Sequence, residues 1–299
     1  MIRQASAVAF MLLPSLLVGG CAWLGRNKAN TDAGAIHVVI GPPYQSDGMW
    51  HYPRNFVSYN KTGLAIIIPP GHEAMTTDGE VFSQSALTAE SPVLPLPSLV
   101  RLTDLVNGRA IVIRVNDRGP MHSGRLIAVT RKVAKLLEFP RGGVVEVRVQ
   151  LLVRRSAALR ASIRRPTQTV AVPIATVQAT ALPPPPGAAG TAGNIANAAQ
   201  HKFSSKLPQA RTSLNGRVEN TAPDPGPLYV SINGFGSAPD AYGIRAKLGT
   251  MPAGIVPVQG TGRTLYTIKV GPYYSVTAAD SAFRRVLDLG IPNPEIVVR

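Results

Sequence analysis

The spacing of hydrophobic positions divides the chain into an apolar leader, two structured regions and a segment between them that cannot bury a core. Residues 5–18 are almost wholly apolar, whereas residues 154–218 contain no acidic residue and are rich in Pro, Ala and small polar residues. Residues 60–152 and 228–298 hold short apolar runs broken by turn residues. Such runs are typical of strands, so both regions are expected to be rich in β structure.

The first structured region reads as a small β domain with one helix. Asn107-Gly108 lies between two apolar runs, which is a strong signal for a β-hairpin. The pattern is consistent with a closed barrel. We expect strands at 64–68, 99–102, 110–115, 126–129 and 144–152, and a helix at 130–137.

In the second structured region, segments with the hydrophobic period of a strand alternate with segments that have the period of a helix. The order of its elements is βαββαβ, which is the split ferredoxin-like pattern. We expect strands at 228–232, 255–258, 264–270 and 295–298, and helices at 238–248 and 276–289.

The N-terminus has the layout of a signal peptide. Met1-Ile2-Arg3 precedes the apolar run, and Leu-Val-Gly-Gly-Cys at 17–21 looks like a bacterial lipobox, in which Cys21 takes a lipid. Ala22 follows where Asp would resemble an inner-membrane retention signal, so outer-membrane sorting is implied. A retained membrane helix is the alternative, but the run is short and contains Pro14.

Charge and composition exclude several kinds of site. The chain has 31 Lys+Arg against 16 Asp+Glu, and nine of the +15 net charges fall in the segment 154–218. Without interleaved aromatic residues this segment reads as an extended tether, attracted at most to anionic wall polymers or lipids, and nucleic acid is not an expected partner. One Cys allows no intramolecular disulfide, and no Cys/His cluster suggests a metal. No metal or cofactor is therefore expected.

Several motifs occur together in one order. They are Thr-Thr-Asp-Gly-Glu-Val-Phe at 76–82, Ala-Leu-Thr-Ala at 86–89, Leu-Pro-Leu-Pro-Ser at 94–98 and Arg-Val-Asn-Asp-Arg-Gly-Pro at 114–120. Because these four motifs occur in this order, the chain resembles the rare lipoprotein A family of septal-ring lytic transglycosylases, whose core is a double-psi β-barrel. Tyr-Val-Ser-Ile at 229–232 and Lys-Val-Gly-Pro-Tyr at 269–273 resemble a SPOR domain, which binds peptidoglycan strands stripped of peptide.

The resemblance, together with the composition of the leader and of the basic segment, implies a domain plan. It comprises a signal peptide at 1–20, an N-terminal strap at 21–58, a catalytic double-psi β-barrel at 59–152, a disordered basic linker at 153–226 and a small α+β SPOR domain at 227–299.

Glu80 and Asp117 are the candidate catalytic residues. Cleaving a glycosidic bond needs a proton for the leaving oxygen and stabilisation of positive charge at the anomeric carbon, which carboxyl groups provide. By resemblance they fall on the family's two essential acidic positions, and they are expected to face one groove. The division of roles between the two acids stays open, and a carboxylate beside Arg118 tends to stay ionised, which mildly favours Glu80 as the proton donor.

The chain departs from the family pattern at several positions. Ser91 and Ala128 stand where the family has His and Asp, and Ile-Ile-Ile-Pro at 66–69 replaces an aromatic sugar platform. His72 and His122 are candidates to replace the imidazole, although each reads more simply as a solvated loop residue. The residues expected to bind substrate are Arg118, Ser91, Tyr229, Ser231 and Tyr266.

The leading hypothesis is a lipid-anchored outer-membrane lytic transglycosylase that faces the periplasm and acts on denuded glycan at the division septum, where septal division proteins are suggested partners. A noncatalytic glycan-binding scaffold of the division site is the alternative, motivated by Ser91 and Ala128. A hydrolase, which would leave reducing ends, is the third possibility.

Overall fold

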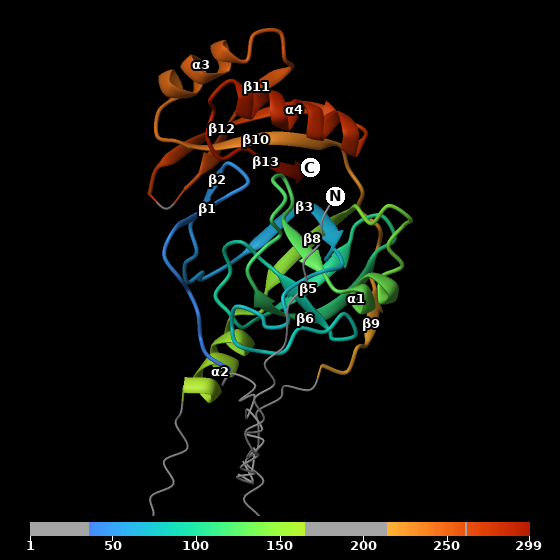
Figure 1. The fold of residues 1–299 in the computed structure, drawn as a ribbon. Coiled ribbons are helices and arrows are strands. Elements are labelled where there is room, and N and C mark those ends of the chain that lie inside the picture. The colour runs from blue at the N-terminus through green and yellow to red at the C-terminus, as the bar shows by residue number, and fades with distance from the viewer. Residues whose placement is uncertain (1–35, 165–213, 261) are drawn as a thin grey trace, which may run out of the picture. The chain divides into compact units, whose positions relative to one another are not determined.

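A closed ring of strands forms the first structured region. The computed structural model describes residues 36–164, 214–260 and 262–299 (Figure 1). The ring runs β4-β7-β3-β8-β5-β6 and closes because β6 pairs again with β4. Pairs β3–β7 and β4–β6 are parallel and the others antiparallel. The strands are β3 (Asn60–Ile67), β4 (Thr88–Glu90), β5 (Ser98–Asp104), β6 (Arg109–Asp117), β7 (Ile127–Val129) and β8 (Val145–Leu151).

The ring confirms the predicted double-psi β-barrel, and alternation along its strands fills it. On β6 the side chains of Ile111, Ile113 and Val115 are buried in the barrel core. The predicted hairpin joins β5 to β6. Gly108 sits in its turn with φ +77°, and a Cβ there would collide with the backbone of Thr221. This turn therefore requires glycine.

Helix α1 (Arg131–Leu136) matches the predicted helix of this region. Strand β4 was not predicted, because its three residues are too few to show a period. An antiparallel hairpin of β1 (Tyr44–Ser46) and β2 (Met49–His51) precedes the barrel.

Both ends of the expected tether are ordered, in contrast to the prediction. Residues 153–164 form helix α2 (Val153–Arg164), which Ser156 fastens to β5 because its hydroxyl accepts from Leu99 N at 2.9 Å. Its Ala and Arg content favours a helix. Strand β9 (Val218–Asn220) adds to the barrel beside β6. The remainder of the predicted linker, 165–213, lies outside the described residues, as do the predicted signal peptide and Cys21.

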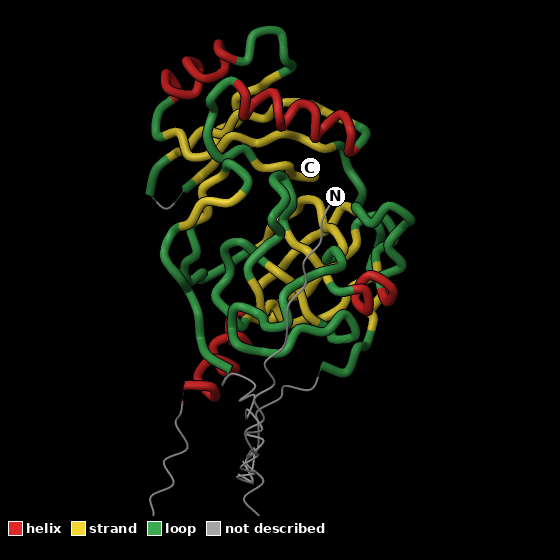
Figure 2. Tube along the Cα trace, in the orientation of Figure 1, coloured by secondary structure: helices red, strands yellow, loops and turns green. Residues whose placement is uncertain are grey.

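The C-terminal region has the predicted βαββαβ order. Its sheet runs β11-β12-β10-β13, with every neighbouring pair antiparallel. Helices α3 and α4 lie over one face of it (Figure 2), where Leu228, Val230 and Ile232 share a core with Phe283 and Val286. The elements are β10 (Leu228–Phe235), α3 (Ala238–Lys247), β11 (Ala253–Gln259), β12 (Thr264–Tyr273), α4 (Val276–Asp288) and β13 (Glu295–Val298).

Helix ends in this region are capped by side chains. Ser237 Oγ accepts from Asp240 N, and Ser275 Oγ accepts from Ala278 N. Each cap satisfies a backbone donor of the first turn. Within the parts of the chain that the structure describes, no helix combines the length and apolar character needed to cross a bilayer.

Candidate active site

The loop after β3 bends back over the end of β6 and is held there by its own side chains. Thr76 Oγ1 donates a hydrogen bond of 2.7 Å to Asp78 Oδ1 and accepts one from Glu80 N at 3.1 Å. The next residue, Thr77, donates its backbone N–H to Asp117 Oδ1 at 2.9 Å. One loop therefore brings both predicted catalytic carboxyls to the same strand end.

Glu80 is held by donors on the outer side of β6. Its carboxylate accepts from Arg114 at 2.6 Å and from Asn116 Nδ2 at 2.8 Å. These two partners alternate along β6 with the core residues Ile113 and Val115, so they lie on the opposite side of the strand. Since donors already occupy the Glu80 oxygens, the sequence-based preference for Glu80 as proton donor loses its basis.

Asp117 lies in a different set of contacts. Its Oδ1 accepts from Thr77 N, from the Thr77 hydroxyl and from Arg118 N, which fixes the plane of the carboxyl group. Its Oδ2 faces the Nε2 atom of His72 at 3.1 Å. No residue that the structure describes bonds to the carboxyls of both Asp117 and Glu80, so the predicted pair is divided between two clusters.

His72 and Glu90 complete the cluster at Asp117. His72 Nε2 lies 3.0 Å from Glu90 Oε1, and its ring stacks on Phe82 with ring centroids 4.0 Å apart. Glu90 ends β4 and pairs in register with Asp117 of β6 and with Ala128 of β7. His72 is thus built into the site rather than solvated in a loop.

Burial shapes the electrostatics of the two clusters. Glu90 is only 5% exposed, and loss of solvation raises its pKa to about 7, with the neighbouring Asp117 adding to the rise and His72 opposing it. Asp78 is fully buried, and desolvation raises its pKa to about 6. Asp78 Oδ2 is the buried side-chain atom of the described residues that has no hydrogen-bond partner.

The structure places the other predicted substrate-binding residues as follows. The guanidinium of Arg118 donates to the backbone carbonyls of Ile40, Ser91 and Leu94. Ser91 is buried, and its hydroxyl accepts from Leu94 N at 3.3 Å. Both residues shape the loop that follows β4, and direct contact of either with a substrate stays a prediction.

The predicted residues of the C-terminal sheet are split between its two faces. Tyr229 and Ser231 alternate with the core residues of β10 and so face away from the helices. Lys269 lies over the Tyr229 ring at 5.4 Å. Tyr266 instead packs against the core, because it shares the side of β12 that carries Ile268 and Val270. The expectation of one surface holding all three is therefore wrong for Tyr266.

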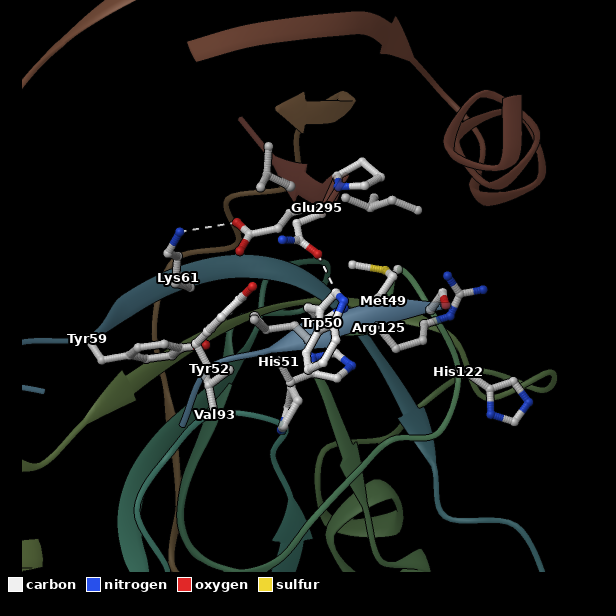
Figure 3. Close-up of a pocket in the computed structure, with 18 of the residues that line it drawn as sticks. Met49, Trp50, His51, Tyr52, Tyr59, Lys61, Val93, His122, Arg125 and Glu295 are labelled. Carbon is white, nitrogen blue, oxygen red and sulfur yellow. Dashed lines mark hydrogen bonds and ion pairs between the residues drawn. The ribbon is translucent and has the colours of Figure 1, made fainter. Parts of the chain in front are cut away.

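A cavity of about 330 Å³ adjoins the loop that follows Glu90, although Glu90 itself does not line it. Pro92 and Val93 continue from Glu90 and line this cavity, together with Trp50 and Tyr52 of the N-terminal segment. The two aromatic side chains are 49% and 52% exposed and lie around the space drawn in Figure 3. They offer aromatic surface near the site that the Ile66–Ile67 sequence of β3 does not.

The cluster of His72, Glu90 and Asp117 is also where a metal ion would find donors. Its three ligand atoms lie within 4.8 Å of one another, and no other such group occurs in the described ranges. An imidazole with two carboxylates is a donor set that divalent metals accept. The sequence did not indicate this group, because its members are separated along the chain and no spacing motif links them.

Glu90 is the functional candidate that sequence reasoning missed. Glu90 precedes Ser91 in the motif region. The signal that could have identified it is a charged residue in a short segment whose residues are all buried in β4. Charged residues are rarely buried without a partner or a function, so the prediction of a strand there would have drawn attention to it.

Sequence comparisons with known proteins match the barrel region and most of the chain. The model of a family described as lytic transglycolase matches residues 59–149, which include the barrel and both clusters. The endolytic peptidoglycan transglycosylase RlpA of Pseudomonas aeruginosa strain UCBPP-PA14 is 31% identical over 281 residues, 85% of this chain and 76% of that protein. The RlpA of Salmonella typhimurium is 34% identical over 207 residues, 68% of this chain and 51% of its own. The RlpA of Neisseria meningitidis serogroup B is 34% identical over 125 residues, which are 41% of this chain and 52% of that protein.

Proposed function

We propose, from the premise that this chain belongs to the RlpA family of endolytic peptidoglycan transglycosylases, that it cleaves peptidoglycan glycan strands without using water. The observation that carries the proposal is the pair of carboxyl clusters that the 76–80 loop gathers at one end of β6. They supply the acidic groups that glycosidic bond cleavage needs.

The bond cleaved is the β-1,4 bond between N-acetylmuramic acid and N-acetylglucosamine. An acid donates a proton to the leaving oxygen as the C1–O4 bond breaks, and a carboxylate stabilises positive charge at C1. The 6-hydroxyl of the same muramic acid then attacks C1, and its proton returns to the conjugate base of the acid. The product is a 1,6-anhydro end, and no proton is gained or lost overall.

The proton must come from a group that holds one at neutral pH. Glu90 meets this condition better than Glu80, whose oxygens are occupied by Arg114 and Asn116. Asp117, with one oxygen fixed by three donors, is suited to stabilising the developing positive charge.

The C-terminal region serves as a SPOR module that binds glycan stripped of peptide. Support comes from its βαββαβ order and from the face of β10 opposite the helices, which carries the half-buried Tyr229 and the buried Ser231. Tethering a binding module to the catalytic barrel raises the effective concentration of the glycan. Cys21 anchors the chain to the outer membrane, with its domains in the periplasm at the septum.

The test is digestion of amidase-treated sacculi by the purified full-length protein, with soluble fragments analysed by mass spectrometry. We expect 1,6-anhydro ends, and strong loss of them in Asp117→Asn. Reducing ends in their place would mean a hydrolase. Failure to release any fragment would contradict the enzyme assignment.

Noncatalytic glycan binding is the second candidate function, and the exposed Trp50 and Tyr52 at the cavity favour it. Aromatic faces present apolar surface with polar edges, which suits a sugar ring. Co-sedimentation with denuded sacculi, without any released fragment, would select this function over the lytic one.

A further inference from the structure

The cavity drawn in Figure 3 is lined by three side chains that are always or usually cationic, Arg54, Lys61 and Arg125. Two of these charges are compensated. Lys61 Nζ lies 3.2 Å from a carboxylate oxygen of Glu295, and the guanidinium of Arg125 makes two hydrogen bonds of 2.7 and 2.8 Å to the carboxylate of Asp280. No carboxylate in the described parts of the chain forms an ion pair with Arg54. The cavity therefore has one cation whose charge is available to a ligand.

The environment of Arg54 holds its guanidinium in place without neutralising it. The guanidinium carbon lies 5.0 Å from the centroid of the Phe56 ring, and the backbone N–H of Arg54 donates to the carbonyl of Val93 at 3.3 Å. Phe56 in turn meets the Tyr59 ring edge-on at 5.1 Å, and both rings pack against the barrel core. A guanidinium that stacks on an aromatic face keeps its N–H edge free to donate hydrogen bonds.

The same cavity presents aromatic surface. The side chains of Trp50 and Tyr52 are about half exposed there, and rings of this kind offer apolar faces with polar edges that suit a sugar ring. His51 lies between them in sequence, and burial lowers the pKa of its imidazole, so it adds no charge at neutral pH. A volume of about 330 Å³ falls within the range of small-molecule pockets, roughly 300–1,000 Å³.

Stacking surface beside a single available cation fits a sugar that carries a carboxylate. When an amidase removes the stem peptide from peptidoglycan, it hydrolyses the amide at the lactyl group of N-acetylmuramic acid and leaves a carboxylate in its place. Peptide-bearing strands have a neutral amide at that position, and N-acetylglucosamine has no such group. The undescribed residues 165–213 contain no acidic residue and cannot supply the anion instead.

We propose that this cavity is a subsite for one peptide-free N-acetylmuramic acid unit, with Arg54 binding the lactyl carboxylate while the rings of Trp50 and Tyr52 contact the sugar. The inference rests on the proposed glycan substrate. A guanidinium binds a carboxylate through two parallel hydrogen bonds, which gives such a contact both strength and orientation. The barrel region would then discriminate stripped strands from peptide-bearing ones by itself, in addition to any selection by the C-terminal module.

The fluorescence of Trp50 tests this subsite separately from the C-terminal module. The chain has two tryptophans, Trp23 and Trp50, so full-length protein carrying Trp23→Phe has its one tryptophan at the cavity. We expect soluble peptide-free glycan oligosaccharides to change the emission of Trp50 in a saturable way. The same oligosaccharides with their carboxylates converted to neutral methylamides should bind at least about tenfold more weakly, because the charged hydrogen bonds are lost.

Arg54→Gln and the matched control Arg141→Gln assign this discrimination to one side chain. Arg141 is also exposed, but it lies in the turn before β8 and does not line the cavity. In the Trp23→Phe background, Arg54→Gln should bind the charged glycan about tenfold more weakly and should bind the charged and neutral glycans equally. Arg141→Gln should match the parent protein, and Arg54→Lys should keep part of the preference for the charged glycan. Thermal melting checks that each variant is folded.

Three results would overturn the subsite: no response of Trp50 to the glycan, equal affinity for the charged and neutral glycans in the parent protein, or equally strong binding of polyglutamate. The last would mean that Arg54 attracts any polyanion. Release of anhydro products from denuded sacculi is measured in parallel. Product release without a charge-dependent Trp50 response would defeat the subsite and leave the lytic function standing, whereas the opposite pair of results would defeat the lytic function and leave the subsite standing.

Discussion

The carboxyl clusters on the two sides of β6 differ in the charge and hydrogen-bonding character of the groups that surround each carboxyl. Glu80 faces two donors, Arg114 and Asn116, whereas Glu90 faces a second acid and an imidazole nitrogen. The first arrangement fixes a carboxylate in place. The second brings acceptor atoms together and requires a positive charge between them, so the two carboxyl groups differ in what holds them in place.

Asp117→Asn should have the largest effect. The amide keeps the shape of the side chain but removes the negative charge beside the reacting carbon. We expect release of anhydro products to fall by on the order of 100- to 10,000-fold, with little change in melting temperature. Mass spectrometry of digested sacculi measures this, and activity within threefold of the unmodified protein would show that Asp117 lies outside the reaction.

Glu80→Gln should act first on stability. It leaves the partly buried Arg114 guanidinium without its carboxylate, at a cost of roughly 2–3 kcal/mol of unfolding free energy. Urea unfolding of Glu80→Gln against Arg114→Gln and the double variant measures the coupling. The contrast between the clusters would break down if Glu80→Gln left stability unchanged and abolished activity, because Glu80 would then be acting on the substrate.

Gly119→Ala should disturb the Glu90 cluster alone. The new methyl group meets Glu90 Oε2, and φ +147° is strained for alanine, so we expect about 1–3 kcal/mol of destabilisation and roughly tenfold slower product release. Gly142→Ala is the control, since it also has a positive φ but has no atom within 4 Å of its added Cβ. Equal loss of activity in both variants would attribute the effect to backbone strain and not to displacement of Glu90.

Asp78→Asn should stabilise the protein at alkaline pH. The folded-state pKa of Asp78 is raised to about 6, so its ionisation destabilises the fold progressively as pH rises from about 4 to 6 and fully above that range. Removing the charge should add about 1–2 kcal/mol at pH 8 and nothing near pH 4. Thermal melts at the two pH values check the sign, and a destabilised variant at pH 8 would contradict the burial argument.

Trp50→Ala should have the smallest effect. It removes exposed aromatic surface at the cavity and keeps the backbone N–H that bonds Asn293. We expect binding to denuded sacculi to weaken by roughly threefold to tenfold, with the catalytic rate on bound glycan unchanged. Sedimentation assays at graded sacculus concentration measure this affinity. An unchanged affinity would show that glycan does not bind at the cavity.

The strand pattern of both regions could be predicted from sequence because each buried run is local. The hairpin at Asn107-Gly108 and the βαββαβ order depend on neighbouring residues and were found. Helix α2 was missed because charge and later prolines outweighed the helix propensity of residues 153–164. Local patterns were therefore enough to predict most strands and helices, but not the ordered structure at the two ends of the tether.

The candidate site was predicted only in part. Glu80 and Asp117 could be singled out from motifs, yet their separation into two clusters follows from alternation along β6 combined with the path of the 76–80 loop. Glu90 and Asp117 meet through the parallel pairing of β4 with β6, and His72 reaches both from the loop after β3, so the cluster joins distant segments. Sequence alone contains no measure of that distance.

The most direct measurement of the contrast between the two clusters is the pH dependence of anhydro-product release by Glu80→Gln and Glu90→Gln, compared on the same denuded sacculi. We expect the rate of product release by Glu80→Gln to be lower but still to fall as the pH rises above about 7, where Glu90 loses its proton. In Glu90→Gln this fall in rate should be absent. The reverse result, with the fall in rate absent in Glu80→Gln and present in Glu90→Gln, would contradict this account.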